Sequence, residues 1–480
     1  MNFSILFIFI TAFIVKGEKK DGYCHQYCYS FDYVRSQTSF FSTKTPYFTM
    51  RRKEIGKQFQ VANCDPVKIW LYIRHGARLP KAKEMDRLSQ LENLRTEIIA
   101  NYKKSNSTIA FGAMCEADLD LLREWQWNWN ITKEYDEHLT TQGWNDIKLI
   151  AARYRQFLPN IFEDNYNKQK YLFRYTDVQR TEASFKAFVE GLFGSNAHQY
   201  INVPPQSENV KLLKPYKFCA SNEEKITGNQ SEYRKYLRSN IMTQLAIDVS
   251  ERLGFGCPLK ITQILDVYDM CIYEHAWNPK ATSAWCSAFT PSQIHELEYI
   301  EELRKYYESG YGIKTNERLV CSLVNDMLNH IGNNDEPKAV VYVTHSSSLL
   351  LLLTALKAFS DADSLRASNY YSMSTRKWRL SNIAPLAANF AAVKYNCPND
   401  IEQEKVRFFL NEDLIEFDWC DKGLCNWSDV KKEYDDYIQA SCDEYYCSSS
   451  NTRESQSGYM FSIALLILAF ISCLFVSFSV

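Results

Sequence analysis

The chain has 480 residues, of which 46% are hydrophobic and 23% are charged, a composition typical of a globular protein with one large core or two moderate ones. Its 55 Lys and Arg residues are balanced by 57 Asp and Glu residues, so the formal net charge is −2. This balance argues against a nucleic-acid partner, and an anionic ligand would need a local cluster of cations.

The N-terminal segment is almost entirely apolar from Phe3 to Val15, and Lys16, Gly17 and a charged stretch follow it. This pattern predicts a secretory signal peptide over residues 1–17. An uncleaved membrane anchor is the alternative. Because the run holds 13 residues, it falls short of the roughly 20 that a spanning helix needs.

Four runs of β-forming residues alternate with helical patterns along the chain. They predict strands over Lys68–Ile73, Tyr171–Tyr175, Ala339–Val343 and Ala387–Tyr395. A helical pattern over Asp177–Leu192 follows the second strand and places Arg180 in or near its first turn. The third strand ends at His345 and leads into a run of leucines, which we expect to form a helix capped by Ser346 or Ser347.

Strands that alternate with helices predict an α/β fold with a mainly parallel central sheet flanked by helices. We expect this core to cover about 40–84, 140–195 and 332–440. Strand signals are sparse in the intervening segments, where we expect largely α-helical insertions over about 85–139 and 196–331. In such sheets ligands bind beyond the carboxyl ends of the strands.

The loop after the first strand carries the clearest chemical signal, the heptad Arg-His-Gly-Ala-Arg-Leu-Pro at residues 74–80. An uncharged imidazole nitrogen of His75 can attack a phosphoryl group if flanking cations offset the negative charge of the phosphate. Arg74 and Arg78 bracket His75 for this purpose. Gly76 would allow a phosphate to approach the backbone closely.

The C-terminal segment 459–480 carries no charged residue, and a polar spacer, 448–458, precedes it. Small residues, a spacer and an apolar tail form the signal for a GPI anchor, with attachment expected near Ser448 to Asn451. A transmembrane helix is the alternative. We expect a secretory protein held by this tail at the extracellular face of the plasma membrane. The sequence carries no signal for an oligomeric state.

The chain has 15 cysteines, which in an exported protein predict a disulfide framework. Three close pairs would also suit a metal, but no histidine stands beside them at the spacing of a zinc site, and we expect no metal. These pairs are Cys24 and Cys28, Cys420 and Cys425, and Cys442 and Cys447. Acceptor motifs for glycosylation occur at Asn106, Asn130, Asn229 and Asn426.

The heptad resembles the Arg-His-Gly-x-Arg-x-Pro signature of histidine acid phosphatases. The similarity extends over nearly all of residues 18–447 to the branch of multiple inositol polyphosphate phosphatases. The segments that carry it include Ser42–Tyr47, Leu121–Trp125, Arg180–Leu192, Trp285–Cys286, Tyr306–Gly312 and Pro385–Asn389.

The resemblance implies a histidine phosphatase-like fold and hydrolysis of inositol polyphosphates through a phosphohistidine, without a metal or an organic cofactor. It also allows 2,3-bisphosphoglycerate as a substrate. It assigns His75 as the nucleophile and Arg74, Arg78, Arg180 and His345 as ligands of the phosphate. It further implies disulfides that join Cys64 to Cys397 and Cys271 to Cys286.

The sequence departs from this family at the second motif, where His-Ala-Glu is replaced by His345-Ser346-Ser347. A carboxylic acid there would protonate the leaving alcohol, a role that contributes about 10²–10⁴ in rate. Three outcomes stay open: another acid enters the cleft, the enzyme is slow, or the protein binds phosphate esters without turnover. We expect Ser347 to contact substrate, and Lys44 either to bind further substrate phosphates or to be a solvated charge.

Overall fold

The structure is a computed structural model that describes residues 27–50, 56–104, 112–201, 203, 210–217, 222–335 and 337–442. The expected signal peptide, the polar spacer, the apolar tail and Asn106 lie outside these residues. Within the described part of the chain, no helix combines the length and the apolar character needed to cross a bilayer.

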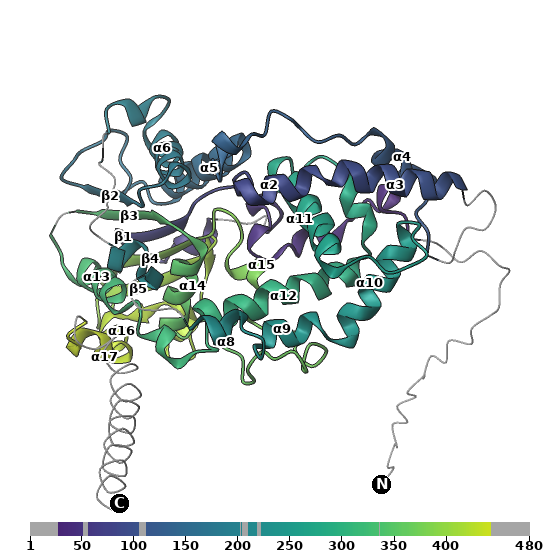
Figure 1. Ribbon diagram of the computed structural model, residues 1–480. Coiled ribbons are helices and arrows are strands. Elements are labelled where there is room, and N and C mark those ends of the chain that lie inside the picture. Colours follow the sequence, from purple (N-terminus) through teal and green to yellow (C-terminus); the bar gives the residue numbers. More distant parts are fainter. Residues whose placement is uncertain are drawn as a thin grey trace, which may run out of the picture.

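A seven-stranded mixed sheet forms the centre of the protein (Figure 1). Its strands are β1 (Asp65–Arg74), β2 (Tyr171–Tyr175), β3 (Ala339–Thr344), β4 (Asn389–Asn396), β5 (Glu404–Leu410), β6 (Asp413–Leu414) and β7 (Cys425–Asn426). The order is β2-β3-β1-β4-β5-β6, and β7 pairs with β5. The first three strands in this order run parallel, and β4 to β7 add antiparallel pairs at one side.

The predicted α/β class and the parallel centre of the sheet are therefore confirmed, and all four predicted strands are present. The strand expected from Ala387 begins two residues later, at Asn389. Ala387 has a φ of 58°, a left-handed conformation that a strand residue does not adopt. Its N–H donates instead to the carbonyl of His75 at 3.1 Å, so this turn belongs to the loop that carries the heptad.

Helices cover both faces of the sheet (Figure 1). On one face lie α5 (Thr141–Phe157) and α6 (Gln179–Phe193), and α6 packs against β2 and β3. The other face carries α13 (Cys321–Gly332), α14 (Ser346–Ala355), α16 (Trp427–Glu433) and α17 (Asp435–Gln439). Although α13 falls within the range expected for an insertion, it packs against β1 and β4.

The side chains of β1 alternate between these two layers because successive strand residues point to opposite faces. Ile69, Leu71 and Ile73 belong to the apolar cluster that includes α5 and α6, whereas Trp70 and Tyr72 belong to the cluster that includes α13 and α14. Both faces are buried, which explains why the strand has a continuous apolar run.

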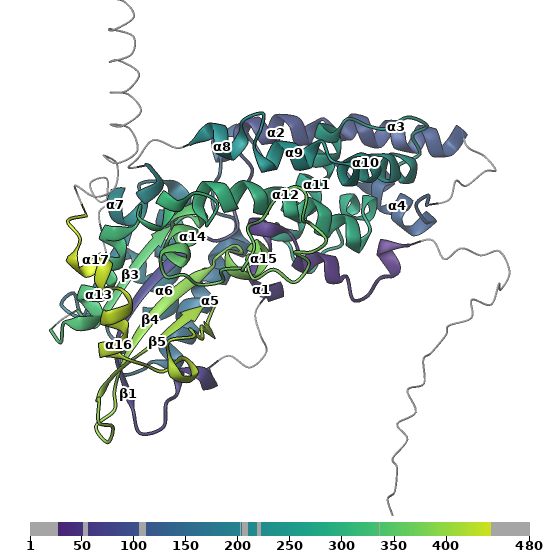
Figure 2. The same ribbon diagram turned by 90° about the horizontal axis from the view of Figure 1, so that it is seen from below.

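A group of helices beside the sheet forms the rest of the protein, as Figures 1 and 2 show. Its longer members are α2 (Ala82–Ser89), α3 (Leu91–Lys104), α4 (Glu116–Glu124), α10 (Asn240–Arg252), α11 (Ile261–Trp277) and α12 (Pro291–Ser309). Shorter ones are α1 (Tyr47–Met50), α7 (Val210–Leu213), α8 (Glu223–Thr227), α9 (Glu232–Leu237) and α15 (Leu380–Ile383).

Helix α12 is the most important of these for function, and local sequence defines both of its ends. Thr290 caps it by accepting from the N–H of Gln293, Pro291 is its first residue, and Gly310 follows its last residue. One face of α12 packs in the core, and its C-terminal half reaches the edge of the sheet where the heptad lies.

Five disulfides join cysteines among the described residues: Cys28–Cys115, Cys64–Cys397, Cys271–Cys286, Cys321–Cys442 and Cys420–Cys425. The pairs Cys64–Cys397 and Cys271–Cys286, which the family resemblance implies, are confirmed. Such a framework is typical of a secreted or luminal protein. Cys28 and Cys442 pair with distant cysteines rather than with their close neighbours in sequence.

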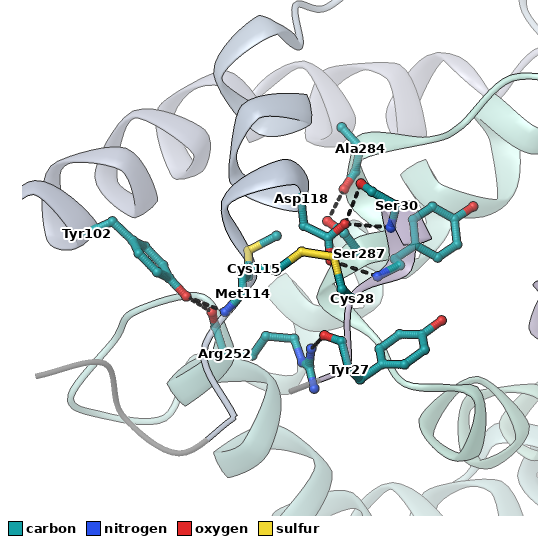
Figure 3. The surroundings of a disulfide bond; sticks show 11 residues. Tyr27, Cys28, Ser30, Tyr102, Met114, Cys115, Asp118, Arg252, Ala284 and Ser287 are labelled. Carbon is teal, nitrogen blue, oxygen red and sulfur yellow. Dashed lines mark hydrogen bonds between the residues drawn. A yellow bond between two sulfur atoms is a disulfide. The ribbon is translucent and has the colours of Figure 1, made fainter. Parts of the chain in front are cut away.

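Figure 3 shows how Cys28–Cys115 fastens the N-terminal segment to α4. Asp118 lies beside the bridge and accepts hydrogen bonds from the backbone N–H groups of Tyr29 at 2.9 Å and Ser30 at 2.8 Å. Because both sulfur atoms are bonded to each other, this group of Cys28, Cys115 and Asp118 offers no thiolate to a metal.

Replacing Cys64 and Cys397 together by serine should lower the free energy of unfolding by about 2–5 kcal/mol. The bridge joins positions 333 residues apart and therefore restricts the unfolded chain strongly. Differential scanning calorimetry measures the loss. The matched control replaces Cys420 and Cys425, which are 5 residues apart, and should lose less stability. Equal losses from the two variants would contradict this loop-length argument.

Candidate active site

The carboxyl ends of β1 and β3 lie side by side, because Arg74 pairs with Thr344 in the parallel register. The next residue in each chain segment is a histidine. The backbone N–H of His75 donates to the carbonyl of Thr344 at 3.0 Å. The rings of His75 and His345 have centroids 5.6 Å apart and meet edge to face. The two strands thus bring together histidines that are 270 positions apart in the sequence.

The hydrogen bonds of His75 fix which of its ring nitrogens carries the proton. Nδ1 lies 2.9 Å from the carbonyl oxygen of Gly76, and because a carbonyl can only accept, Nδ1 is the protonated nitrogen of the neutral ring. Nε2 then holds a lone pair. Burial lowers the pKa of His75 well below 6.5, and the cations Arg74 and Arg180 lower it further. His75 is therefore an uncharged imidazole with a nucleophilic nitrogen.

The fold gives a further reason for glycine at position 76, besides the expected approach of a phosphate. A Cβ at this position would lie 2.4 Å from the backbone oxygen of Gly143 in α5, and a Cβ on Gly143 would lie 2.3 Å from the carbonyl oxygen of Ala77. The two glycines therefore let the heptad loop pack directly against α5. This contact holds the backbone on either side of His75.

Three arginines surround the two histidines. Arg74 is buried, and its Nη1 donates to the backbone carbonyls of Ala384, at 2.8 Å, and of Thr43. Burial and the nearby Arg78 lower the pKa of Arg74 to about 9, so it remains a cation at neutral pH. These backbone contacts fix one side of its guanidinium group.

Arg78 and Arg180 share one carboxylate. Glu137 forms an ion pair with Nη2 of Arg78, at 3.4 Å, and accepts a hydrogen bond from Nη1 of Arg180 at 3.2 Å. Arg180 lies in the first turn of α6, as the sequence predicts. Glu137 is an acid that sequence reasoning missed. Its own backbone is left-handed, with a φ of 53°, and its N–H donates to the carbonyl of Pro80 at 3.1 Å.

All seven sequence-predicted site residues line one cavity of about 480 Å³ between the edge of the sheet and α11 and α12. They are Lys44, Arg74, His75, Arg78, Arg180, His345 and Ser347. Such a volume is in the range of sites for small molecules. Lys44 is not an isolated solvated charge. Its Nζ lies 3.2 Å from Asp269 and 5.3 Å from the ring centroid of Tyr273.

The helix after His345 begins one residue earlier than expected. His345 itself is the N-cap of α14, so neither Ser346 nor Ser347 caps it. Nε2 of His345 is hydrogen-bonded to Oγ1 of Thr176, at 3.0 Å, in the loop that follows β2. The Ser347 side chain is free to make other contacts, and its Oγ lies 2.8 Å from Nζ of Lys305 and 3.0 Å from Oε1 of Glu308.

Comparison with known proteins places this site in a family. The model of the histidine phosphatase superfamily (branch 2) matches residues 70–411, which is more than half of the chain. The chain belongs to branch 2 of the histidine phosphatase superfamily. The predicted histidine acid phosphatase family is thus confirmed.

Two relatives support the predicted similarity within this phosphatase superfamily. The multiple inositol polyphosphate phosphatase 1 of Drosophila melanogaster is 44% identical over 434 residues, covering 90% of this chain and 92% of the relative. The human protein of the same name is 26% identical over 409 residues, covering 78% of this chain and 80% of the relative.

Solved structures of the superfamily share the fold. The phytase from D. castellii matches with a TM-score of 0.68 and 17% identity, covering 84% of this chain and 86% of that one. The multiple inositol polyphosphate phosphatase of Bifidobacterium longum, in complex with inositol hexasulfate, matches with a TM-score of 0.56 and 14% identity. It covers 82% of this chain and 96% of that one.

Replacing Arg180 by glutamine should raise the pKa of His75, because Arg180 is one of the cations that lower it. As the pH falls, the ring of His75 should therefore become protonated at a higher pH in the variant than in the parent protein. Proton NMR titration of the His75 ring, assigned with His75→Gln, measures the change. Arg407→Gln is the control, since Arg407 lies outside the cavity and bonds the carbonyl of Gln58. An unmoved titration in Arg180→Gln would mean that Arg180 does not contribute and that burial and Arg74 lower this pKa.

Proposed function

We propose that the protein hydrolyses phosphomonoesters of inositol polyphosphates, with His75 as the nucleophile. The observation that carries the proposal is the neutral imidazole of His75. Its Nδ1–H is hydrogen-bonded to the carbonyl of Gly76, so Nε2 keeps a lone pair. The ring lines a cavity that also contains Arg74, Arg78 and Arg180. The similarity to multiple inositol polyphosphate phosphatases and phytases supports the substrate class.

In the proposed first step Nε2 of His75 attacks phosphorus, so that a P–N bond forms as the P–O ester bond breaks. Arg74, Arg78 and Arg180 offset the charge on the phosphoryl oxygens. His345 is proposed to bind the same phosphoryl group. Water then attacks phosphorus, releases inorganic phosphate and returns His75 to its neutral form.

The rest of the cavity suits a ligand with several phosphates. Beyond the heptad, its lining includes further cations that could meet phosphates away from the reacting one: Lys44, Lys81, Arg304 and Lys305. Several phosphate groups of one substrate could therefore each lie near a cation. For this reason we propose inositol hexakisphosphate as the preferred substrate. We propose 2,3-bisphosphoglycerate as a further, smaller substrate of the same site.

A second candidate function is binding of phosphate esters without turnover. It is favoured by the motif His345-Ser346-Ser347, which carries no carboxylate to protonate the leaving alcohol. In this case the cavity would hold inositol hexakisphosphate tightly while the ester bonds stay intact.

Purified protein should release phosphate from inositol hexakisphosphate and form an acid-labile phosphohistidine, and His75→Ala should lower the release by more than about a thousandfold. Phosphate release and rapid-quench labelling measure these quantities. The control is His198→Ala, because His198 lies outside the cavity and pairs with Glu190. Equal release from parent and His75→Ala would exclude the hydrolase, and calorimetric binding without release would favour the second candidate.

We also propose that the protein is exported, glycosylated and held at the cell surface by a GPI anchor near Ser448 to Asn451. Exposed Asn130 and Asn229 are suitable acceptors, and the disulfides fit an oxidising compartment. When the full chain is expressed, phosphatidylinositol-specific phospholipase C should release the anchored protein, which has lost its apolar tail, from the cells, and deletion of 459–480 should cause secretion. Retention after the lipase would indicate a transmembrane tail instead.

A further inference from the structure

The position where a carboxylic acid is missing is part of a hydrogen-bonded group of three side chains. Ser347 is the second residue of α14, and its hydroxyl lies between Lys305 and Glu308, which both come from α12. The ammonium of Lys305 donates to Oγ of Ser347 at 2.8 Å, and Oγ of Ser347 donates to Oε1 of Glu308 at 3.0 Å. Lys305 also lies 2.8 Å from Oε1 of Glu308. We call these three residues the Lys305–Ser347–Glu308 relay.

We propose that Lys305 supplies the proton of the leaving alcohol, and that it does so through the hydroxyl of Ser347. This inference rests on the proposed function, because it names the source of a proton that the hydrolysis needs. Ser347 would touch the reacting oxygen, whereas Lys305 would act through Ser347 as a positioning and proton-supplying residue.

The proposed relay requires the leaving group to face Ser347, which lines the same cavity as His75. Nucleophilic attack at phosphorus expels the group opposite to the nucleophile. The histidines and Arg74 lie at the edge of the sheet, and α12 together with the first turn of α14 contributes other parts of the cavity wall. Ser347 lines the cavity at this wall, two residues beyond His345.

Lys305 fits the role of proton source better than Glu308 does. Oε2 of Glu308 is 2.7 Å from Arg304, and Oε1 is 2.8 Å from Lys305. Although burial raises the pKa of Glu308, these two cations hold it below its usual value, so the group is an ionised carboxylate. Only 8% of the Lys305 side chain is exposed, and burial lowers its pKa, which makes its ammonium a stronger acid.

The groups around Lys305 come from several elements. On α12 they are Glu301, Arg304 and Glu308. Titratable groups of other elements line the same cavity: Lys44 of the short helix η3 (Ser42–Lys44), Arg74 at the end of β1, His75, Arg78, Lys81, Glu84, Glu137, Arg180, Tyr216 of η7 (Pro215–Lys217), Tyr233, Tyr268, Asp269, Tyr273 and His345. The two carboxylates keep the ammonium charged, while burial and the neighbouring cations favour loss of its proton.

The proton balance of the reaction closes with this relay. The hydroxyl of Ser347 first rotates so that its proton turns from Glu308 to the ester oxygen. As the P–O bond breaks, its electron pair stays on the ester oxygen, which takes this proton. Ser347 takes a proton from Lys305 in the same movement, leaving a neutral amine. In the second step the attacking water gives a proton to Ser347, which passes one to Lys305. The net reaction is ester plus water to alcohol plus phosphate. Related Ser–Lys pairs serve as acid and base in other hydrolases.

The test compares two leaving groups. Inositol hexakisphosphate releases an alkoxide that needs a proton, whereas p-nitrophenyl phosphate releases a phenolate that does not. Rapid-quench measurement of phosphohistidine formation isolates the first step for each substrate. The quantity of interest is the ratio of the two rates, which is insensitive to the fraction of folded protein.

Lys305→Arg and Lys305→Met should each lower the ratio of the inositol rate to the aryl rate by about 10²–10³. Arginine keeps the positive charge but cannot release a proton, so a purely electrostatic role would leave the ratio of Lys305→Arg intact. Ser347→Ala should lower the ratio similarly. The matched control is Lys394→Met, which removes a buried lysine of β4 that bonds Asn334 outside the cavity and should leave the ratio unchanged.

The pH profile gives a second readout. Because Lys305 donates only while protonated, the ratio should fall on the alkaline side, beginning below the ordinary pKa of lysine, about 10.4. This limb should be absent in Lys305→Arg. Glu308→Gln, which retains an acceptor for Ser347 and Lys305, should change the ratio by less than about tenfold.

Two outcomes would overturn the relay. If the ratio of the inositol rate to the aryl rate is unchanged in both Lys305 variants, the relay is wrong but the proposed hydrolysis is not affected. A collapse of the ratio in Glu308→Gln together with a normal ratio in Lys305→Arg would transfer the role to the carboxylate. Absence of phosphohistidine from both substrates in the parent protein would instead reject the proposed function, and the relay with it.

Discussion

The parallel pairing of β1 with β3 sets Arg74 opposite Thr344, and the position of every group at the site depends on this register. A shift of one residue would exchange the buried faces of β1, because Ile69 and Trp70 belong to different apolar layers. The same shift would separate the histidines that follow the two strands. Core packing on both sides of the sheet thus fixes the geometry of the chemistry at its edge.

The cavity next to this edge is rich in charge, and four of its cations already pair with carboxylates, whereas Arg74 contacts backbone carbonyls. Glu137 holds Arg78 and Arg180, Asp269 holds Lys44, and Glu308 holds Lys305. Buried cations without such partners would carry a large desolvation cost. An anionic ligand must therefore displace a carboxylate from its cation or share the cation with it. The site should select ligands whose negative charge is large enough to compete with these carboxylates.

Sequence reasoning located the strands and the heptad because those signals are local. A buried strand and the loop after it are adjacent in the chain, so Arg74, His75 and Arg78 could be placed without knowing the fold. The alternation of strands and helices then predicted that His345 and Arg180 would reach the same edge. The start of α14 was wrong by one residue, since His345 with its extended backbone takes the position expected for a serine.

The contacts of Ser347 could not be predicted in the same way. Helical periodicity indicates that Lys305 and Glu308 lie near each other on α12, but it does not show which part of the chain that face meets. Glu137 was missed for a similar reason, because only the fold brings its loop to Arg180. The packing role of Gly76 was also missed, since its neighbour is Gly143 of a helix that begins more than 60 residues later.

The bridge between Cys64 and Cys397 lies at the start of β1 and just past the end of β4, so it closes the edge of the sheet that is opposite to the histidines. A reductant that opens this bridge acts at the ends of β1 and β4 that lie farthest from the two histidines. Opening this bridge would remove a constraint on the unfolded chain without touching the groups at the site. Reducing conditions would therefore change the stability of this protein before they change the geometry of its cavity.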